Sequence, residues 1–236
     1  MSTLRSSAIP VTDPSAGLRI TEIFYSLQGE ANTLGLPTVF IRLTGCPLRC
    51  TYCDTTYSFE GGERQSLDEI IQTTLDFKTP YVCVTGGEPL AQPNAIPLMQ
   101  KLADLGCEVS LETSGALDVS KVDPRVSKVL DLKTPTSGEK KRNLMSNLEH
   151  LTQHDQIKFV ICNREDYEWS KLQVEQYKMN EKVSTVWFSP AFAIEKGAVR
   201  LPQLARDLAQ WILEDHIPVR FQLQLHKLLW NDETGR

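Results

Sequence analysis

The sequence has 236 residues, of which 41% are hydrophobic and 23% are charged, and its formal net charge is -5. These values are typical of a globular protein, and no apolar run approaches the roughly 20 residues that a membrane-spanning helix requires. The negative charge argues against nucleic acid as a partner, because phosphate-binding proteins usually carry a basic surplus. A small-molecule ligand and no membrane partner are therefore favoured.

The chain is predicted to form one domain over residues 17–230, since a core of this size is easily filled by a single α/β unit. Residues 1–16 are rich in Ser, Pro and Ala and lack the apolar segment of a secretory signal, so they predict a flexible arm. Residues 231–236 predict a short polar tail. The protein is expected in the cytoplasm, where a tight cysteine cluster more often binds metal than forms disulfides.

Strands and helices are predicted to alternate along the chain. Apolar, β-branched runs predict strands at residues 38–43, 81–85, 107–113, 128–133, 157–161, 184–189 and 219–224. Helical periodicity predicts helices at residues 66–77, 95–106, 164–178 and 201–216. Ser66 is the expected N-cap of the first helix, and Glu69 completes a capping box. This alternation indicates βα units with a mainly parallel sheet, while residues 134–143 predict a surface loop.

Distinctive polar residues follow three of the predicted strands directly. A cysteine loop follows residues 38–43, the tetrapeptide Gly86-Gly87-Glu88-Pro89 follows residues 81–85, and Ser114 follows residues 107–113. Both open α/β sheets and barrels build their sites at the carboxyl ends of parallel strands. We therefore expect the functional site at this end of the sheet.

The cysteine loop holds Cys46, Cys50 and Cys53 at the spacing C-x3-C-x2-C, with no fourth cysteine or histidine close behind. A [4Fe-4S] cluster held by three thiolates keeps one iron open for an outside ligand. That iron can bind the amine and carboxylate of S-adenosylmethionine (SAM). A structural zinc site would need a fourth ligand from a distant histidine. The candidates are His150, His154, His216 and His226.

The cysteine spacing, with Tyr52 directly before the last cysteine, resembles the radical SAM superfamily. The Gly86-Gly87-Glu88 sequence resembles the motif that contacts the methionyl amino group of SAM in that superfamily. The resemblance implies an incomplete (β/α)6-type barrel that carries a [4Fe-4S] cluster on the three cysteines. It also implies cofactor-binding positions at Tyr52, Cys53, Asp54, Gly86, Gly87, Glu88, Ser114, Asp131, Leu132 and Lys133.

Further segments resemble the 7-carboxy-7-deazaguanine synthase family over residues 18–230. They are residues 26–30 (SLQGE), Arg42, the Asp54-Thr55 pair and residues 222–227 (QLQLHK). This family converts 6-carboxy-5,6,7,8-tetrahydropterin to 7-carboxy-7-deazaguanine with loss of ammonia, on the route to queuosine and other deazapurines, and uses SAM catalytically. The resemblance implies substrate-binding positions at Leu27, Gln28, Gly29, Glu30, Arg42, Thr85 and His226.

The same resemblance implies Mg²⁺ at Thr55, a homodimer, and an electron donor such as flavodoxin or ferredoxin. The sequence departs from many members at Ala31, where they have glycine, and at residues 131–133, where they have Ser-Pro-Lys. Two alternatives remain open. A radical SAM activase would form a glycyl radical on a partner protein, and a zinc-stabilised binding module would have no catalytic activity. No residue is singled out as a catalytic acid or base.

Overall fold

The computed structural model describes residues 17–191, 203–230 and 233–235, so the predicted flexible arm lies outside the described residues. The strands are β1 (Gly17–Leu27), β2 (Pro37–Leu43), β3 (Glu63–Ser66), β4 (Tyr81–Gly86), β5 (Glu108–Thr113), β6 (Ser127–Asp131), β7 (Gln156–Ile161), β8 (Thr185–Pro190) and β9 (Arg220–Phe221). The helices are α1 (Leu67–Asp76), α2 (Ala95–Asp104), α3 (Arg164–Gln176), α4 (Met179–Lys182), α5 (Gln203–Asp215) and α6 (Leu225–Trp230).

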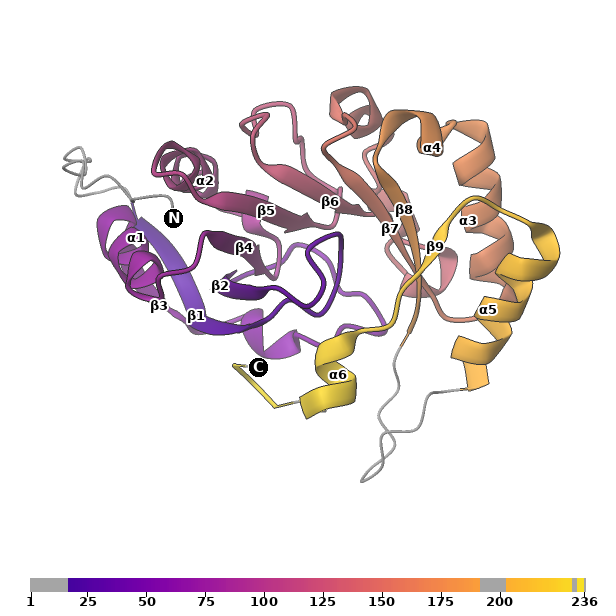
Figure 1. Cartoon of the computed structure of the whole chain (residues 1–236), viewed down its shortest axis with the longest axis horizontal. Coiled ribbons are helices and arrows are strands. Elements are labelled where there is room, and N and C mark those ends of the chain that lie inside the picture. The colour runs from indigo at the N-terminus through magenta and orange to yellow at the C-terminus, as the bar shows by residue number, and fades with distance from the viewer. Residues whose placement is uncertain (1–16, 192–202, 231–232, 236) are drawn as a thin grey trace.

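The strands form one nine-stranded sheet in the order β3-β1-β2-β4-β5-β6-β7-β8-β9. Neighbouring strands from β2 to β9 are parallel, while β1 pairs antiparallel with β2 and β3. The sheet is strongly curved, and helices α1, α2, α3 and α5 lie on its outer side (Figure 1). This arrangement confirms the predicted incomplete barrel. None of the helices in the described ranges is long and apolar enough to cross a membrane.

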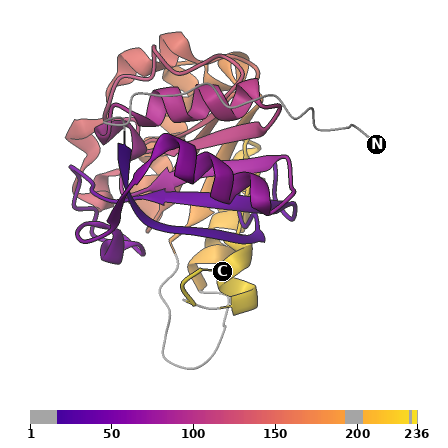
Figure 2. The same cartoon turned by 90° about the vertical axis from the view of Figure 1, so that its left-hand side faces the viewer.

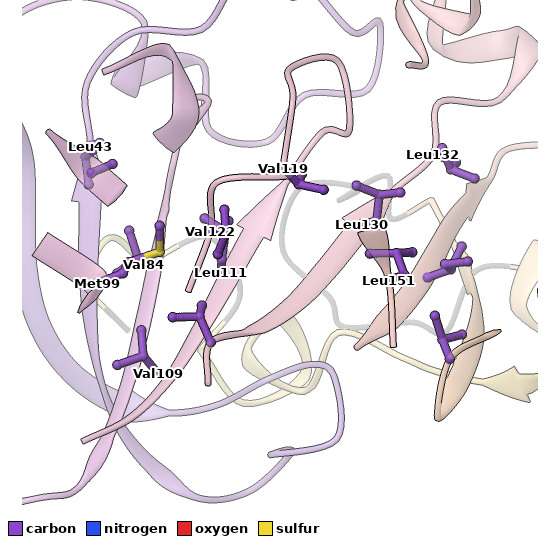
Figure 3. Close-up of a cluster of buried hydrophobic side chains, with 14 of the residues drawn as sticks. Leu43, Val84, Met99, Val109, Leu111, Val119, Val122, Leu130, Leu132 and Leu151 are labelled. Carbon is purple, nitrogen blue, oxygen red and sulfur yellow. The ribbon is translucent and has the colours of Figure 1, made fainter. Parts of the chain in front are cut away.

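The hydrophobic core lies between the curved sheet and its covering helices. Leu43, Val84, Leu111 and Leu130 come from four neighbouring strands, and Met99 of α2 packs in the same cluster (Figure 3). All five side chains are fully buried. Because successive side chains of a strand point to opposite faces, the residues next to them in sequence point to the inner side of the barrel.

The alternation places polar side chains inside the barrel. Three polar residues lie next to a core residue on their strand and line the same interior cavity. They are Arg42 on β2, Thr85 on β4 and Glu112 on β5. Lys158 of β7 also lines this cavity, and it lies between the buried residues Ile157 and Phe159. The apolar runs that predict the strands therefore also contain the polar groups of the site.

Helix α6 occupies a different place from the other helices. It lies apart from the helices on the outer side of the sheet, in both views of the molecule (Figures 1 and 2). The backbone nitrogen of Leu225 donates to the carbonyl oxygen of Gly29 at 3.0 Å. This contact joins the carboxyl-terminal part of the chain to the loop between β1 and β2, across the open side of the barrel.

The predicted secondary structure needs correction in several places. Strand β3 was not predicted, because its sequence ERQS is polar, and the short helices α4 and α6 were not predicted either. Strand β1 was not predicted, because its sequence places Arg19 and Glu22 among the apolar residues and only its first part is deeply buried. The predicted strand at residues 219–224 is wrong beyond Phe221. After one further bond, from the Gln222 nitrogen to the carbonyl oxygen of Phe188, the chain leaves the sheet and enters α6.

The other predicted elements agree closely with the structure. Helix α1 begins after Ser66, whose hydroxyl accepts from the Glu69 nitrogen at 3.2 Å while the Glu69 carboxylate accepts from the Ser66 nitrogen at 2.8 Å. The predicted capping box is thus confirmed. Residues 134–143 form a loop as expected, with short 3₁₀ turns at Pro135–Ser137 and Lys140–Arg142.

Candidate active site

A cavity of about 260 Å³ lies at the carboxyl ends of the parallel strands. All but two of the site residues expected from the sequence line it, so the structure brings together positions from Leu27 to His226. The exceptions are Glu88 and Leu132. The lining members are Leu27, Gln28, Gly29, Glu30, Arg42, Cys46, Cys50, Tyr52, Cys53, Asp54, Thr55, Thr85, Gly86, Gly87, Ser114, Asp131, Lys133 and His226.

The cysteine loop is anchored to the loop that follows β6. The Thr51 hydroxyl donates to the carbonyl oxygen of Thr136 at 2.8 Å, and the Arg49 nitrogen donates to the Glu139 carboxylate at 2.6 Å. The Arg49 side chain donates to the carbonyl oxygen of Cys46 at 2.7 Å. These bonds fix the backbone on both sides of Cys50, so the three thiols are held at one wall of the cavity.

The three thiols are free and partly exposed, as ligands of a large inorganic group should be. Within residues 17–191, 203–230 and 233–235, no three His, Cys, Asp or Glu side chains converge as they would around a single metal ion. In a [4Fe-4S] cluster each cysteine binds a different iron, so the thiolates line the cluster rather than meet at one point. Three free thiols that line one cavity therefore fit a cluster.

Two opposing effects act on the pKa of these three thiols. Burial raises the pKa of Cys50 to about 11 and also raises the pKa of Cys46 and of Cys53. The ammonium group of Lys133 acts in the opposite direction on all three. A cation at this position favours thiolates, which are the form that binds iron.

The end of β4 lies directly against the start of the cysteine loop. The Gly87 nitrogen donates to the carbonyl oxygen of Leu43 at 3.1 Å, and the Glu88 nitrogen donates to that of Gly45 at 2.9 Å. A Cβ atom on Gly87 would lie 2.2 Å from the oxygen of Gly45 and 2.9 Å from the Cβ of Cys46. Only glycine allows the two segments to approach this closely.

Glu88 and Leu132 lie behind the cavity wall. The Glu88 carboxylate is fully buried and accepts from the Ser114 nitrogen at 2.7 Å, the Ser114 hydroxyl at 2.5 Å and the Thr113 hydroxyl at 2.9 Å. It thereby holds the end of β4 to the end of β5. The Leu132 side chain belongs to the hydrophobic core (Figure 3), so only its backbone can take part in ligand binding.

At the opposite wall, Glu30 lies in a network of buried polar groups. One oxygen of its carboxylate accepts from the ammonium group of Lys158, and the other accepts from the Gln224 amide at 2.6 Å. Burial alone would raise the pKa of Glu30, but the charge of Lys158 and the hydrogen bonds from Lys158 and Gln224 act against burial, and the pKa is lowered. Glu30 is therefore an ionised acceptor that is held in place from two sides.

His226 packs directly on the backbone of Gly29. A Cβ atom on Gly29 would lie 2.2 Å from Nδ1 of His226, so a side chain at this position would displace the imidazole ring. Burial lowers the pKa of His226, which favours the neutral ring at neutral pH. A neutral imidazole can both donate and accept hydrogen bonds, as a heterocyclic ligand requires.

Arg42 is oriented by residues of β1 and of the segment after the cysteines. Its Nε donates to the Glu22 carboxylate at 2.7 Å, and the Tyr57 hydroxyl donates to the same oxygen at 2.8 Å. The guanidinium carbon lies 5.6 Å from the centre of the Phe24 ring. Within the described part of the chain, Nε is the one nitrogen of the Arg42 guanidinium that has a hydrogen bond, so the two outer nitrogens are available to an anionic ligand.

Asp54 connects the cysteine loop to α6. Its Oδ2 lies 2.8 Å from Nζ of the buried Lys227, and its Oδ1 accepts from the Thr55 hydroxyl at 2.8 Å. Burial would raise the pKa of Asp54, but Lys227 and Thr55 lower it well below its usual range. The ion pair fixes both the orientation of Thr55 and the position of α6 at the mouth of the cavity.

Several cavity residues were missed in the sequence. They include Glu112, Lys158, Gln224 and Lys227. Glu22, which lies outside the cavity and binds Arg42, was missed as well. A signal was present for two of the cavity residues, because Glu112 directly follows the buried Leu111 and Lys158 lies between the buried Ile157 and Phe159. A buried charge is unfavourable unless it is paired or functional, so such positions indicate an interior site.

The comparisons with known proteins agree with this site. Residues 40–170 match the family model of the radical SAM superfamily, which covers more than half of the chain. The fold and the site therefore define a radical SAM enzyme, and this class implies a [4Fe-4S] cluster and SAM.

The chain is 44% identical over 223 residues to the 7-carboxy-7-deazaguanine synthase of Koribacter versatilis, covering 92% of this chain and 99% of that protein. It is 42% identical over 222 residues to the synthase of Chlorobaculum tepidum, covering 93% of this chain and 97% of that protein. The chain belongs to the 7-carboxy-7-deazaguanine synthase family. QueE from Escherichia coli shares the fold, with a TM-score of 0.71 at 23% identity over 89% of this chain and 95% of that chain.

Proposed function

We propose that the protein converts 6-carboxy-5,6,7,8-tetrahydropterin to 7-carboxy-7-deazaguanine with loss of ammonia and uses SAM catalytically. It is a radical SAM lyase of deazapurine biosynthesis. The observation that carries the proposal is that one cavity is lined both by the three cysteines and by Glu30, Arg42 and His226. A cluster and a polar heterocycle could therefore be held side by side.

The cofactor end of the cavity is formed by the cysteine loop and the ends of β4, β5 and β6. When bound, the cluster and SAM would supply radical chemistry at C6 of the substrate. The backbone of Gly87 and of Tyr52–Asp54 and the side chains of Ser114, Asp131 and Lys133 are the proposed SAM contacts. Ser114 offers oxygen lone pairs, because its hydroxyl proton is already donated to Glu88.

The substrate end is formed by the β1–β2 loop, Arg42 and α6. The outer nitrogens of Arg42 would bind the substrate carboxylate, since a guanidinium group matches a carboxylate in geometry and charge. The ionised Glu30 would accept from ring N–H groups of the pterin, and Gln28 and Thr85 would bind further edge atoms. Helix α6 excludes water from this end, because Leu225 and Lys227 fasten it over the cavity mouth.

Replacing Glu22 by glutamine is expected to weaken substrate binding. The variant keeps a side chain of the same shape but loses the carboxylate that holds Nε of Arg42 at 2.7 Å. We expect KM for the pterin to rise roughly tenfold with little change in kcat, which corresponds to the loss of one charge-assisted hydrogen bond. Steady-state kinetics would measure the change, and the exposed Glu60→Gln variant is the control. An unchanged KM would contradict the orienting role of Glu22.

We further propose that Mg²⁺ binds at Thr55, with substrate and water oxygens completing an octahedral shell. The Thr55 hydroxyl lines the cavity, and Mg²⁺ prefers oxygen ligands of which the protein often supplies only one or two. Lys227 already occupies one oxygen of Asp54, so Asp54 is assigned to orienting Thr55 rather than to the metal. Bound there, Mg²⁺ would neutralise negative charge on the substrate.

Four further features are proposed, two from the family resemblance and two from the sequence. They are a homodimeric state, a cytoplasmic location, a flavodoxin or ferredoxin as electron donor, and a single domain over residues 17–230. The continuous sheet from β1 to β9 supports the last of these.

The test is an anaerobic assay of the reconstituted protein with reductant, SAM, Mg²⁺ and 6-carboxytetrahydropterin. We expect 7-carboxy-7-deazaguanine over many turnovers without a matching amount of 5′-deoxyadenosine, as followed by mass spectrometry. Accumulation of 5′-deoxyadenosine with the pterin unchanged would refute the substrate and favour an activase. A colourless protein that holds zinc would favour the binding module.

A further inference from the structure

Four acidic side chains line the cavity, and three of them are paired with a lysine. Glu30 contacts Lys158, Asp54 lies 2.8 Å from Lys227, and Asp131 lies 2.9 Å from Lys133. The fourth is Glu112 of β5, which has no ion pair or hydrogen bond among the residues in the described ranges. The charge balance of the cavity therefore leaves one carboxyl group without a counterion.

Glu112 points into the barrel interior between β4 and β6. Its Oε1 is buried and has no hydrogen-bond partner within the described part of the chain. The charged and titratable groups that face it are Cys83 from β4, Asp131 and Lys133 from the end of β6, Lys158 from β7 and Glu30 from the β1–β2 loop. Lys158 is the cation with the strongest effect on Glu112, but its ammonium group is already bonded to Glu30.

These surroundings favour the protonated form of Glu112. Burial raises the pKa of Glu112 to about 8, the charges of Glu30 and Asp131 add to this effect, and those of Lys158 and Lys133 oppose it. A buried carboxyl group that keeps its proton at neutral pH is suited to act as a general acid.

We propose that Glu112 is the catalytic acid and base of ammonia loss. This inference rests on the proposed function and adds a residue to the reaction. As the C–N bond breaks, its electron pair goes to nitrogen, which takes the Glu112 proton and leaves as ammonia. The Glu112 carboxylate then takes a proton from the ring carbon, and the C–H electron pair forms the ring double bond. Glu112 is protonated again at the end of the step, and the step needs no oxidant or reductant.

The test compares wild-type protein with Glu112→Gln, Glu112→Asp and the control Glu108→Gln. Glu108 lies at the exposed amino end of the same strand, far along it from the cavity end. Each reconstituted enzyme receives substrate carrying deuterium at C6. Glu112→Gln is expected to slow deazaguanine formation by roughly 10²–10⁴-fold, the usual range for loss of general acid–base catalysis. It should still transfer deuterium from the substrate to SAM, because that step does not use Glu112.

A second expected result is accumulation of a nitrogen-retaining isomer of the substrate in Glu112→Gln, seen by mass spectrometry after quenching. Glu112→Asp keeps a transferable proton and should lose less activity than Glu112→Gln, while Glu108→Gln should match wild type. If Glu112→Gln had wild-type activity, the inference about Glu112 would be overturned, while the proposed function would stand. If Glu112→Gln lost deuterium transfer and product formation equally, the inference would also be overturned, because Glu112 would then serve in binding rather than in proton transfer. Wild-type protein that makes no deazaguanine would overturn the proposed function itself.

The protonation of Glu112 can be measured without any cofactor. Unfolded chains lose this proton near pH 4.5 and the folded protein near pH 8, so wild-type stability contains a contribution that falls as pH rises between these values. Glu112→Gln removes that contribution, so its free energy of unfolding relative to wild type should rise over the same interval. Urea unfolding of the cofactor-free proteins at several pH values measures the difference. Parallel pH dependence would show an ionised Glu112 and overturn the inference.

Discussion

The Lys158→Met variant is expected to lose about 3–5 kcal/mol of folding free energy, the usual result of removing one partner of a buried ion pair. Lys158 is 7% exposed and Glu30 is 9% exposed, and the two side chains contact each other inside the barrel. Methionine fills a similar volume, so the loss would come mainly from the uncompensated charge of Glu30. Urea unfolding monitored by circular dichroism would measure it.

Two controls separate this effect from a general loss of packing. A second change, Glu30→Gln, removes the remaining charge, so the double variant should recover a large part of the lost stability. The Lys178→Met variant removes a lysine whose side chain is 72% exposed and lies 3.9 Å from Glu181, and its stability should stay close to wild type. If Lys158→Met were no less stable than Lys178→Met, the buried pair would have no structural role.

The cofactor end of the site could be predicted because its residues are close together in the sequence. The cysteine loop, the glycine pair after β4 and Ser114 after β5 are each short segments at the end of a strand, and parallel strands bring such ends together. The position of these segments in the fold depends only on the order of the βα units along the chain. The local pattern therefore carried enough information to place them at one wall of the cavity.

The side-chain pairings at the proposed substrate end could not be predicted in the same way, because they join distant parts of the chain. The pairing of Glu30 with Lys158 spans a sequence separation of 128 residues, and that with Gln224 spans 194 residues. These contacts depend on the curvature of the sheet and on where the chain leaves β9. The alternating sequence of residues 219–224 favours a strand, yet hydrogen bonding to Gly29 turns the following residues into α6.

The Gly87→Ala variant is expected to lose both cluster binding and activity. Its new Cβ would lie 2.2 Å from the carbonyl oxygen and 2.6 Å from the carbonyl carbon of Gly45, which are backbone atoms that cannot rotate away. The cysteine loop would have to move, and Cys46 would move with it. A displacement of about 1 Å in a reacting assembly can lower activity by roughly 10²-fold. Iron content after reconstitution and product formation would both be measured.

Gly35→Ala is the matched control for this change. Gly35 has a φ of +85°, but a Cβ atom there would meet nothing within 4 Å, so alanine adds backbone strain without a clash. It should lower stability by about 1 kcal/mol and leave the iron content unchanged. Normal iron content and activity in Gly87→Ala would contradict the close packing of β4 on the cysteine loop. Loss of iron in Gly87→Ala alone would show that this contact between two backbones sets the position of the cluster ligands.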